Sequence, residues 1–132
     1  MTGVNRGGSV LLVDDEQAIR DLFGRALIAA GVECDGAADG NQALAKLEKR
    51  QYGAVVIDII MPDREGVETI LEIRKRWPDM FVIGMSGGGR IGPEDFLKLA
   101  KMVGADVTLT KPFTPAILVA ALAAGRPPGL AA

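Results

Sequence analysis

Histidine is absent from this sequence, cysteine occurs once, and aromatic residues occupy only 5% of its 132 positions. The single cysteine, Cys34, cannot form an internal disulfide bond, and we interpret it as an inert packing residue. Without histidine or a second cysteine, a metal site built on nitrogen or sulfur ligands is excluded. Any metal ion would therefore be held by oxygen atoms.

Excess positive charge and long hydrophobic runs are also missing. The net charge is −2 and the isoelectric point is about 5.1, so the chain lacks the basic surface that nucleic-acid binding requires. The apolar segment 115–124 is far shorter than the roughly 20 residues that span a bilayer. The N-terminus has no secretory signal pattern. We therefore expect a cytoplasmic protein that binds neither nucleic acid nor a membrane.

Short apolar segments recur along the chain and alternate with helical patterns. Hydrophobic residues make up 48% of the sequence, enough for one domain with a substantial core. Most of these segments do not alternate with polar residues, which is typical of strands buried on both faces. The pattern predicts an α/β fold with a mainly parallel sheet covered by helices on both faces. The expected strands are residues 9–13, 32–37, 54–58, 81–85 and 107–110.

Apolar residues at spacings of three and four predict the helices between these strands. Gly31 suits a helix C-cap, and Pro78 ends another helix. Residues 115–124 form a last helix without any charge. The expected core-facing residues of the earlier helices are Ile19, Leu22, Phe23, Ala26 and Ala30; Ala43, Leu44 and Leu47; Val67, Ile70, Leu71 and Trp77; and Phe96, Leu99, Ala100 and Val103.

Asp58 ends a strand of four consecutive apolar residues, and Pro62 and Gly66 follow it closely. Proline cannot occupy a central strand and glycine permits a positive φ, so the chain must leave the sheet here and restart as a helix. In open α/β sheets, ligands bind at the carboxyl ends of the strands. Asp58 is therefore expected to face a ligand site.

Three other strands also end in polar residues, namely Asp14 and Asp15, Ser86, and Lys111. Singly, such residues are ordinary helix caps, turn acids, loop hydroxyls or solvated charges. Together with Asp58 they place three carboxylates at one edge, where each pair 4 Å apart repels by roughly 4 kcal/mol at an effective dielectric of 20. Mg²⁺ would resolve this conflict, since it prefers carboxylate, carbonyl and water ligands.

The same residues resemble the receiver domain of two-component response regulators, over about residues 9–124. The resemblance implies a flavodoxin-like (βα)5 three-layer sandwich with a five-stranded parallel sheet in the order 2-1-3-4-5. It rests on Asp14-Asp15, on Asp58 followed by Met61-Pro62 and Gly66, on Ser86, and on Lys111-Pro112-Phe113.

The resemblance also implies a role for each residue of the edge. A phosphoryl group would move from the phosphohistidine of a histidine kinase or a histidine phosphotransfer protein to Asp58. Asp14, Asp15 and Asp58 would hold Mg²⁺ together with the main-chain carbonyl of Ile60, and Lys111 would pair with a phosphoryl oxygen. The protein would then be a phosphoprotein of a phosphorelay and not an enzyme, although it would assist its own phosphorylation and dephosphorylation.

Ser86, Thr108 and Pro112 complete the implied set. The hydroxyl of Ser86 would bond a new phosphoryl oxygen, and the peptide bond before Pro112 would be cis. The family's usual aromatic residue three positions before the lysine is Thr108 here, so the ring-rotation half of its switch is missing and the Ser86 half would act alone.

Two further departures concern the loops. The segment 87–92 is a few residues longer than usual and rich in glycine; it either orders on phosphorylation or is a passive insertion, and a nucleotide cradle is a poor third alternative. Ile60 and Gly88 occupy the positions that tune acyl-phosphate hydrolysis in the family. Neither can orient a water molecule, so we expect slow loss of the phosphoryl group.

For the whole chain we expect flexible tails at residues 1–8 and 125–132 around a receiver domain at 9–124. No output domain follows, so we expect a single-domain regulator whose output is a downstream target protein. The uncharged last helix suggests a contact surface for a partner or for a second copy of the chain, although an exposed alanine-rich face without function is the alternative.

Two other classes of protein are weaker alternatives. A haloacid-dehalogenase-type phosphohydrolase also combines aspartates, a hydroxyl and a lysine, but its first-strand acids are spaced Asp-x-Asp, whereas Asp14 and Asp15 are adjacent. A flavodoxin would place hydroxyls and amides after the first strand. Turnover of a phosphate ester, or a bound yellow chromophore, would identify either one.

Overall fold

The computed structural model describes residues 9–59, 65–86, 95, 98–99 and 102–125. One parallel sheet runs through them in the order β2-β1-β3-β4-β5, which confirms the predicted order 2-1-3-4-5. The strands are β1 (Val10–Val13), β2 (Cys34–Ala37), β3 (Ala54–Asp58), β4 (Phe81–Ser86) and β5 (Val107–Thr110).

The central strands are the most apolar ones because both of their faces are covered. Every residue of β1 and of β3 is buried, and the two strands pair in register from Val10 opposite Ala54 to Val13 opposite Ile57. A strand buried on both faces must be apolar throughout, since a buried polar side chain needs a partner. Asp58 is the only charged residue of β3 and lies at its end.

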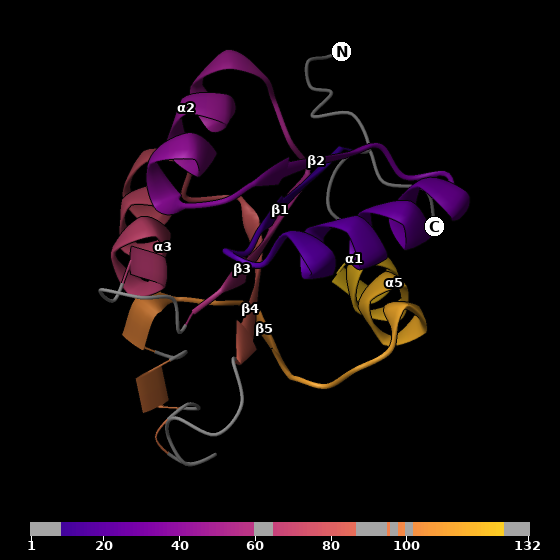
Figure 1. Cartoon of the computed structure of the whole chain (residues 1–132). Helices are drawn as coiled ribbons and strands as arrows, with labels where there is room; N and C mark the ends of the chain where they lie inside the picture. Colours follow the sequence, from indigo (N-terminus) through magenta and orange to yellow (C-terminus); the bar gives the residue numbers. More distant parts are fainter. Residues whose placement is uncertain (1–8, 60–64, 87–94, 96–97, 100–101, 126–132) are drawn as a thin grey trace.

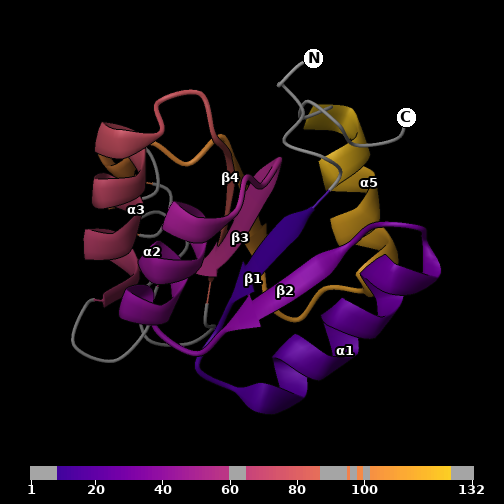
Figure 2. The same ribbon diagram turned by 90° about the horizontal axis from the view of Figure 1, so that it is seen from above.

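Helices cover both faces of the sheet, as Figures 1 and 2 show. The helices α1 (Gln17–Ala29) and α5 (Pro115–Gly125) lie on one face, and α2 (Gly40–Lys49) and α3 (Glu65–Arg76) lie on the other. Each face has its own core: Phe23, Leu27 and Leu118 belong to the first, and Leu47 and Ile70 belong to the second. The three-layer α/β sandwich is thus confirmed.

Three of the predicted core-facing residues, Leu22, Ala30 and Leu71, are exposed. Leu22 of α1 is 52% exposed and Leu71 of α3 is 50% exposed, whereas Leu27 and Ile73 are fully buried in their place. Neighbouring residues of a helix point about 100° apart, so Phe23 and Leu22 cannot both face the sheet. Spacing alone did not decide which of the two lies on the line of contact.

Several predicted features lie outside the described residues. These are the tail 1–8, the segment 87–92, and all but the first residue of the tail 125–132. α5 ends at Gly125, the first residue assigned to that tail. Between β4 and β5, residues 95, 98, 99, 102 and 103 are helical, within the segment predicted as a helix.

Cys34 is half-buried in β2, and its thiol is shielded from ionisation. Burial, together with the neighbouring Asp35 carboxylate, raises the pKa of Cys34 to about 11 from its ordinary 9.0. At pH 8 the reactive thiolate is therefore about a hundredfold scarcer than in an ordinary cysteine. We expect iodoacetamide to alkylate the folded protein about a hundredfold more slowly than the same chain in urea, as mass spectrometry over time would measure. Equal rates in the two states would contradict the inert role of this thiol.

None of the helices in the described part of the chain has the length and hydrophobicity needed to cross a bilayer.

Candidate functional site

The parallel strands bring four of the predicted residues to one edge of the sheet. Asp14 and Asp15 directly follow β1, Asp58 is the last residue of β3, and Lys111 directly follows β5. All strand pairs are parallel, so their carboxyl ends meet at the same edge. The sequence placed these residues at strand ends, and the topology brings those ends together.

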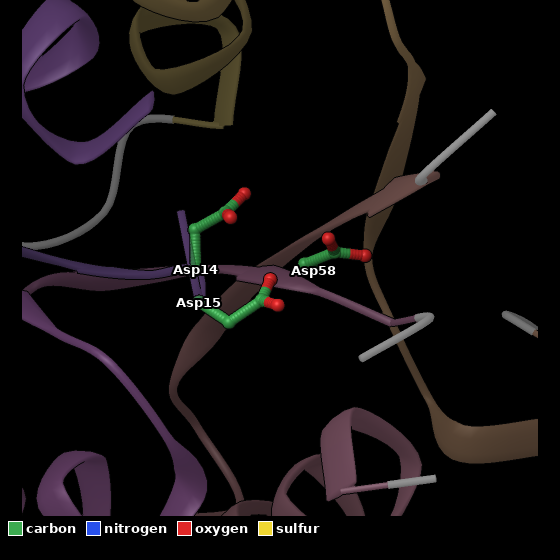
Figure 3. A group of neighbouring side chains, drawn as sticks. All are labelled: Asp14, Asp15 and Asp58. Atoms are coloured by element: carbon green, nitrogen blue, oxygen red, sulfur yellow. The ribbon is translucent and has the colours of Figure 1, made fainter. Parts of the chain in front are cut away.

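Three carboxylates converge at this edge (Figure 3). Asp14, Asp15 and Asp58 each offer an oxygen, and these oxygens all lie within 4.8 Å of one another. Asp14 is fully buried and Asp58 is 3% exposed, while Asp15 is exposed to solvent. Like charges this close repel one another, and the burial of Asp14 and Asp58 strengthens the repulsion because water screens it less. The site therefore requires positive charge.

Lys111 supplies part of that charge. Its ammonium donates hydrogen bonds to Asp14 Oδ2 at 2.7 Å and to Asp58 Oδ2 at 3.2 Å. Burial lowers the pKa of Lys111, but the hydrogen bonds and negative charges of the two aspartates outweigh it, and the pKa lies above its ordinary value. Lys111 is thus a permanent cation that bridges two of the three acids.

The backbone around Asp14 and Asp58 is held closely. The Glu16 N–H donates to Asp14 Oδ1 at 2.9 Å, and the guanidinium of Arg20 donates to the Asp14 main-chain carbonyl at 2.6 Å. On the other side, a Cβ added to Gly66 would overlap the carbonyl oxygen of Asp58. Only glycine lets the start of α3 pack so closely against the end of β3.

Arg20 was not among the residues predicted for the site. A signal was available, because Arg20 precedes the buried Phe23 and Leu27 by three and seven residues and so lies on the sheet-facing side of α1. A charge on that side of a helix needs a partner.

Three further residues were predicted for the site, namely Ser86, Thr108 and Ile60. Ser86 ends β4 opposite Thr110 and Thr108 lies inside β5 opposite Gly84, so the switch roles of Ser86 and Thr108 stay predictions. Ile60 lies outside the described residues.

The turn after Lys111 follows the expected pattern. The Lys111–Pro112 peptide bond is cis, as the resemblance implied. The next residue, Phe113, packs against Phe23 of α1, with ring centroids 5.0 Å apart and the rings tilted by 30°. α1 therefore supports the segment that presents the lysine.

The donor set fits a hard divalent cation. All three side chains are carboxylates, their oxygens are close enough to share one ion, and one lysine leaves the cluster with net negative charge. Ionised carboxylates accept several bonds each, so the contacts of Asp14 with Glu16 and Lys111 do not exhaust it. Mg²⁺ binds through one or two carboxylates and keeps water molecules that phosphate oxygens replace. The arrangement thus joins an acid, a cation and a metal-binding cluster, which are the parts of a phosphoryl-transfer site.

The sequence matches a known protein family and several characterised relatives. Residues 10–123 match the family described as the response regulator receiver domain. The phosphate regulon transcriptional regulatory protein PhoB of Pseudomonas aeruginosa is 35% identical over 120 residues, which cover 89% of this chain and 51% of that protein. The transcriptional regulatory protein TcrA of Mycobacterium tuberculosis is 34% identical over 111 residues, which cover 81% of this chain and 41% of that protein. This chain thus spans about half the length of these regulators.

Solved structures agree with this assignment. A CheY-like response regulator receiver domain protein from Methanospirillum hungatei has a TM-score of 0.81 at 30% identity, and the match covers 90% of this chain and 93% of that one. The chemotaxis protein CheY4 of Vibrio cholerae has a TM-score of 0.80 at 32% identity, with 89% and 98% covered. The chain therefore belongs to the response regulator receiver domain family, whose members are signalling domains of two-component phosphorelays that are phosphorylated on an aspartate.

Proposed function

We propose that this chain accepts a phosphoryl group on Asp58 from a histidine kinase or a histidine phosphotransfer protein, in a Mg²⁺-dependent reaction. The phosphorylated form then signals by changing its affinity for a downstream target protein. The observation that carries the proposal is the Lys111 ammonium, which contacts both Asp14 and Asp58 beside the solvent-exposed Asp15.

The proposed reaction needs little covalent chemistry from the protein. A carboxylate oxygen of Asp58 attacks the phosphorus, the phosphorus–nitrogen bond of the phosphohistidine breaks, and the imidazole leaves with the bonding electron pair. Such transfers depend on positioning and on neutralising the charge of the equatorial oxygens. Asp58 is nearly buried at a strand end, so its backbone is held in place while its carboxylate faces the edge.

Asp14, Asp15 and Asp58 would hold the Mg²⁺ ion, with the main-chain carbonyl of Ile60 as the fourth ligand that the resemblance implies. When bound, Mg²⁺ neutralises charge on the carboxylates and on the phosphoryl oxygens. The Lys111 ammonium contacts both Asp14 and Asp58, and its hydrogen bond to Asp58 is the longer of the two. It can exchange that contact for a phosphoryl oxygen while Asp14 keeps it in place.

The output would be a protein contact made by this domain. The Ser86 hydroxyl is proposed to bond the new phosphoryl oxygen, and slow loss of that group stays a prediction from Ile60 and Gly88. A single-domain regulator in the cytoplasm, without nucleic-acid or membrane binding, is the simplest form of this proposal.

The last helix offers a surface for self-association. Leu118 and Leu122 are the buried residues of α5. On its other side, Ile117 is 46% exposed, and the exposed alanines are Ala116, Ala120 and Ala124. If a second copy covers this face, Ile117→Glu should abolish a dimer that wild type forms with acetyl phosphate, as sedimentation velocity at about 100 µM would measure. Ile28→Glu on α1 is the matched control and should dimerise as wild type does. A wild type that stays monomeric with acetyl phosphate would contradict this role.

Intact mass spectrometry tests the proposed function. Wild-type protein incubated with Mg²⁺ and acetyl phosphate should gain the mass of one phosphoryl group, and EDTA should prevent the gain. A purified histidine kinase domain carrying phosphohistidine is the second donor, so that a requirement for a protein donor is detected. No gain with either donor would indicate an interaction module that works without phosphorylation. Continuous release of phosphate would instead favour a hydrolase.

A further inference from the structure

The main-chain carbonyl of Asp14 lies just beyond the last residue pair of β1. The pairing of β1 with its neighbours β2 and β3 ends at Val13, and the Asp14 N–H still bonds to Ala37 in β2 at 3.1 Å. Asp14 is fully buried, so its carbonyl needs a donor from elsewhere. The Arg20 guanidinium provides that donor at 2.6 Å.

Arg20 reaches this carbonyl by passing over Gly36. α1 lies alongside β2 (Figure 2), and Gly36 pairs with Leu12, whose side chain belongs to the core under α1. A Cβ added at Gly36 would lie 3.3 Å from Arg20 Cδ and 3.7 Å from Arg20 Nε. A larger side chain would occupy the space of the arginine stem. The carbonyl of Gly36 accepts a hydrogen bond from Lys46 of α2, which holds the strand from its other side.

We propose that Arg20, admitted by Gly36, is a positioning residue for the acidic site, and this inference rests on the proposed function. Among the described residues, the guanidinium of Arg20 bonds a main-chain carbonyl and not a carboxylate, and it fixes the peptide that joins Asp14 to Asp15. The residues on the two sides of that peptide, Asp14 and Asp15, carry two of the three carboxylates of the site. A charge-assisted bond to a carbonyl is among the stronger hydrogen bonds of proteins, and groups that orient metal ligands typically change metal affinity by 10–100-fold.

Gly36→Val is the decisive variant, because it displaces Arg20 while keeping every charge of the protein. Arg20→Gln removes the donor group, but it also removes a positive charge, which by itself favours a cation. We therefore expect the Kd for Mg²⁺, measured by calorimetry, to rise about tenfold in Gly36→Val and by a smaller factor in Arg20→Gln. Cys34→Val adds bulk to the same face of β2 away from Arg20, and Arg25→Gln removes an exposed charge from α1; both should stay within twofold of wild type.

Amide hydrogen exchange without metal separates positioning from metal binding. The Asp14 and Glu16 amides are hydrogen-bonded in this loop, and both should exchange about tenfold faster in Gly36→Val and in Arg20→Gln. Exchange in the core of β3 should not change, which also shows that the variants are folded.

Unchanged exchange at Asp14 and Glu16 in both variants, together with a Kd within twofold of wild type, would overturn the inference. Should Gly36→Val fail to fold, Arg20→Gln and Arg20→Lys carry the test, since lysine keeps the charge without the reach and geometry of the guanidinium. A wild type that binds Mg²⁺ but shows no effect of these variants refutes Arg20 alone. A wild type that neither binds Mg²⁺ nor accepts a phosphoryl group refutes the proposed function, and the exchange data still decide whether Arg20 holds the loop.

Discussion

Asp58→Asn is expected to abolish the gain of one phosphoryl group that wild-type protein shows with Mg²⁺ and acetyl phosphate. The amide of asparagine has nearly the shape of the carboxylate but no nucleophilic anion, so the acceptor is lost while the packing at the end of β3 is kept. Intact mass spectrometry after a fixed incubation measures the result directly. We expect no phosphorylated species above background.

The fold should survive this substitution. Among the described residues, Asp58 lies beside two acidic side chains, Asp14 and Asp15, and forms an ion pair with Lys111. Removing its charge thus removes two repulsions between oxygens that lie within 4.8 Å of one another and the ion pair with Lys111 at 3.2 Å. In the absence of Mg²⁺ we expect the free energy of unfolding to be unchanged or raised, as urea denaturation would measure.

Asp21→Asn is the matched control, because it makes the same chemical change on the exposed face of α1. It should be phosphorylated as wild type is. A phosphoryl group that still appears in Asp58→Asn would show that another residue is the acceptor, and peptide mapping would locate it.

Gly66→Ala is expected to lower the free energy of unfolding by about 1–3 kcal/mol, the usual effect of adding a methyl group where there is no space. The added Cβ would overlap the Asp58 carbonyl oxygen and lie 2.5 Å from the Ile59 carbonyl oxygen. Main-chain atoms at the end of a buried strand cannot move aside without shifting the acceptor. We therefore expect slower phosphorylation as well as lower stability, by urea denaturation and by the mass assay.

Gly24→Ala provides a control of opposite sign. Gly24 lies inside α1, and a Cβ there would meet no atom within 4 Å. Alanine stabilises a helix interior by about 0.5–1 kcal/mol relative to glycine. If the free energy of unfolding rises in Gly66→Ala as it does in Gly24→Ala, α3 does not pack tightly against the end of β3.

Most of the sheet could be predicted from the sequence because its strands are short apolar runs. β1 and β3 were assigned closely, since a strand buried on both faces must be apolar throughout. The second strand was predicted to begin at residue 32 but begins at Cys34. Its start was harder to assign because Gly36 and two polar residues weaken the apolar pattern of this segment. The order of the strands came from the family resemblance, because strand patterns alone do not specify neighbours.

The faces of the helices were harder to assign. Leu22 and Phe23 are both apolar and adjacent, and only the packing of Phe23 against Phe113 shows which one faces the core. Phe113 is 90 positions away along the chain. A periodic pattern gives the width of an apolar face but not its centre.

By itself, the sequence determined the chemical identity of this protein's site: acids after the first and third strands and a lysine after the fifth, in a chain without histidine ligands. Local rules suffice for this, since strand ends and turns are marked by neighbouring residues. Only the tertiary structure decided that one ammonium spans Asp14 and Asp58 and that Arg20 passes Gly36 to reach Asp14. Those contacts join segments whose separation in space depends on how the whole sheet and its helices pack.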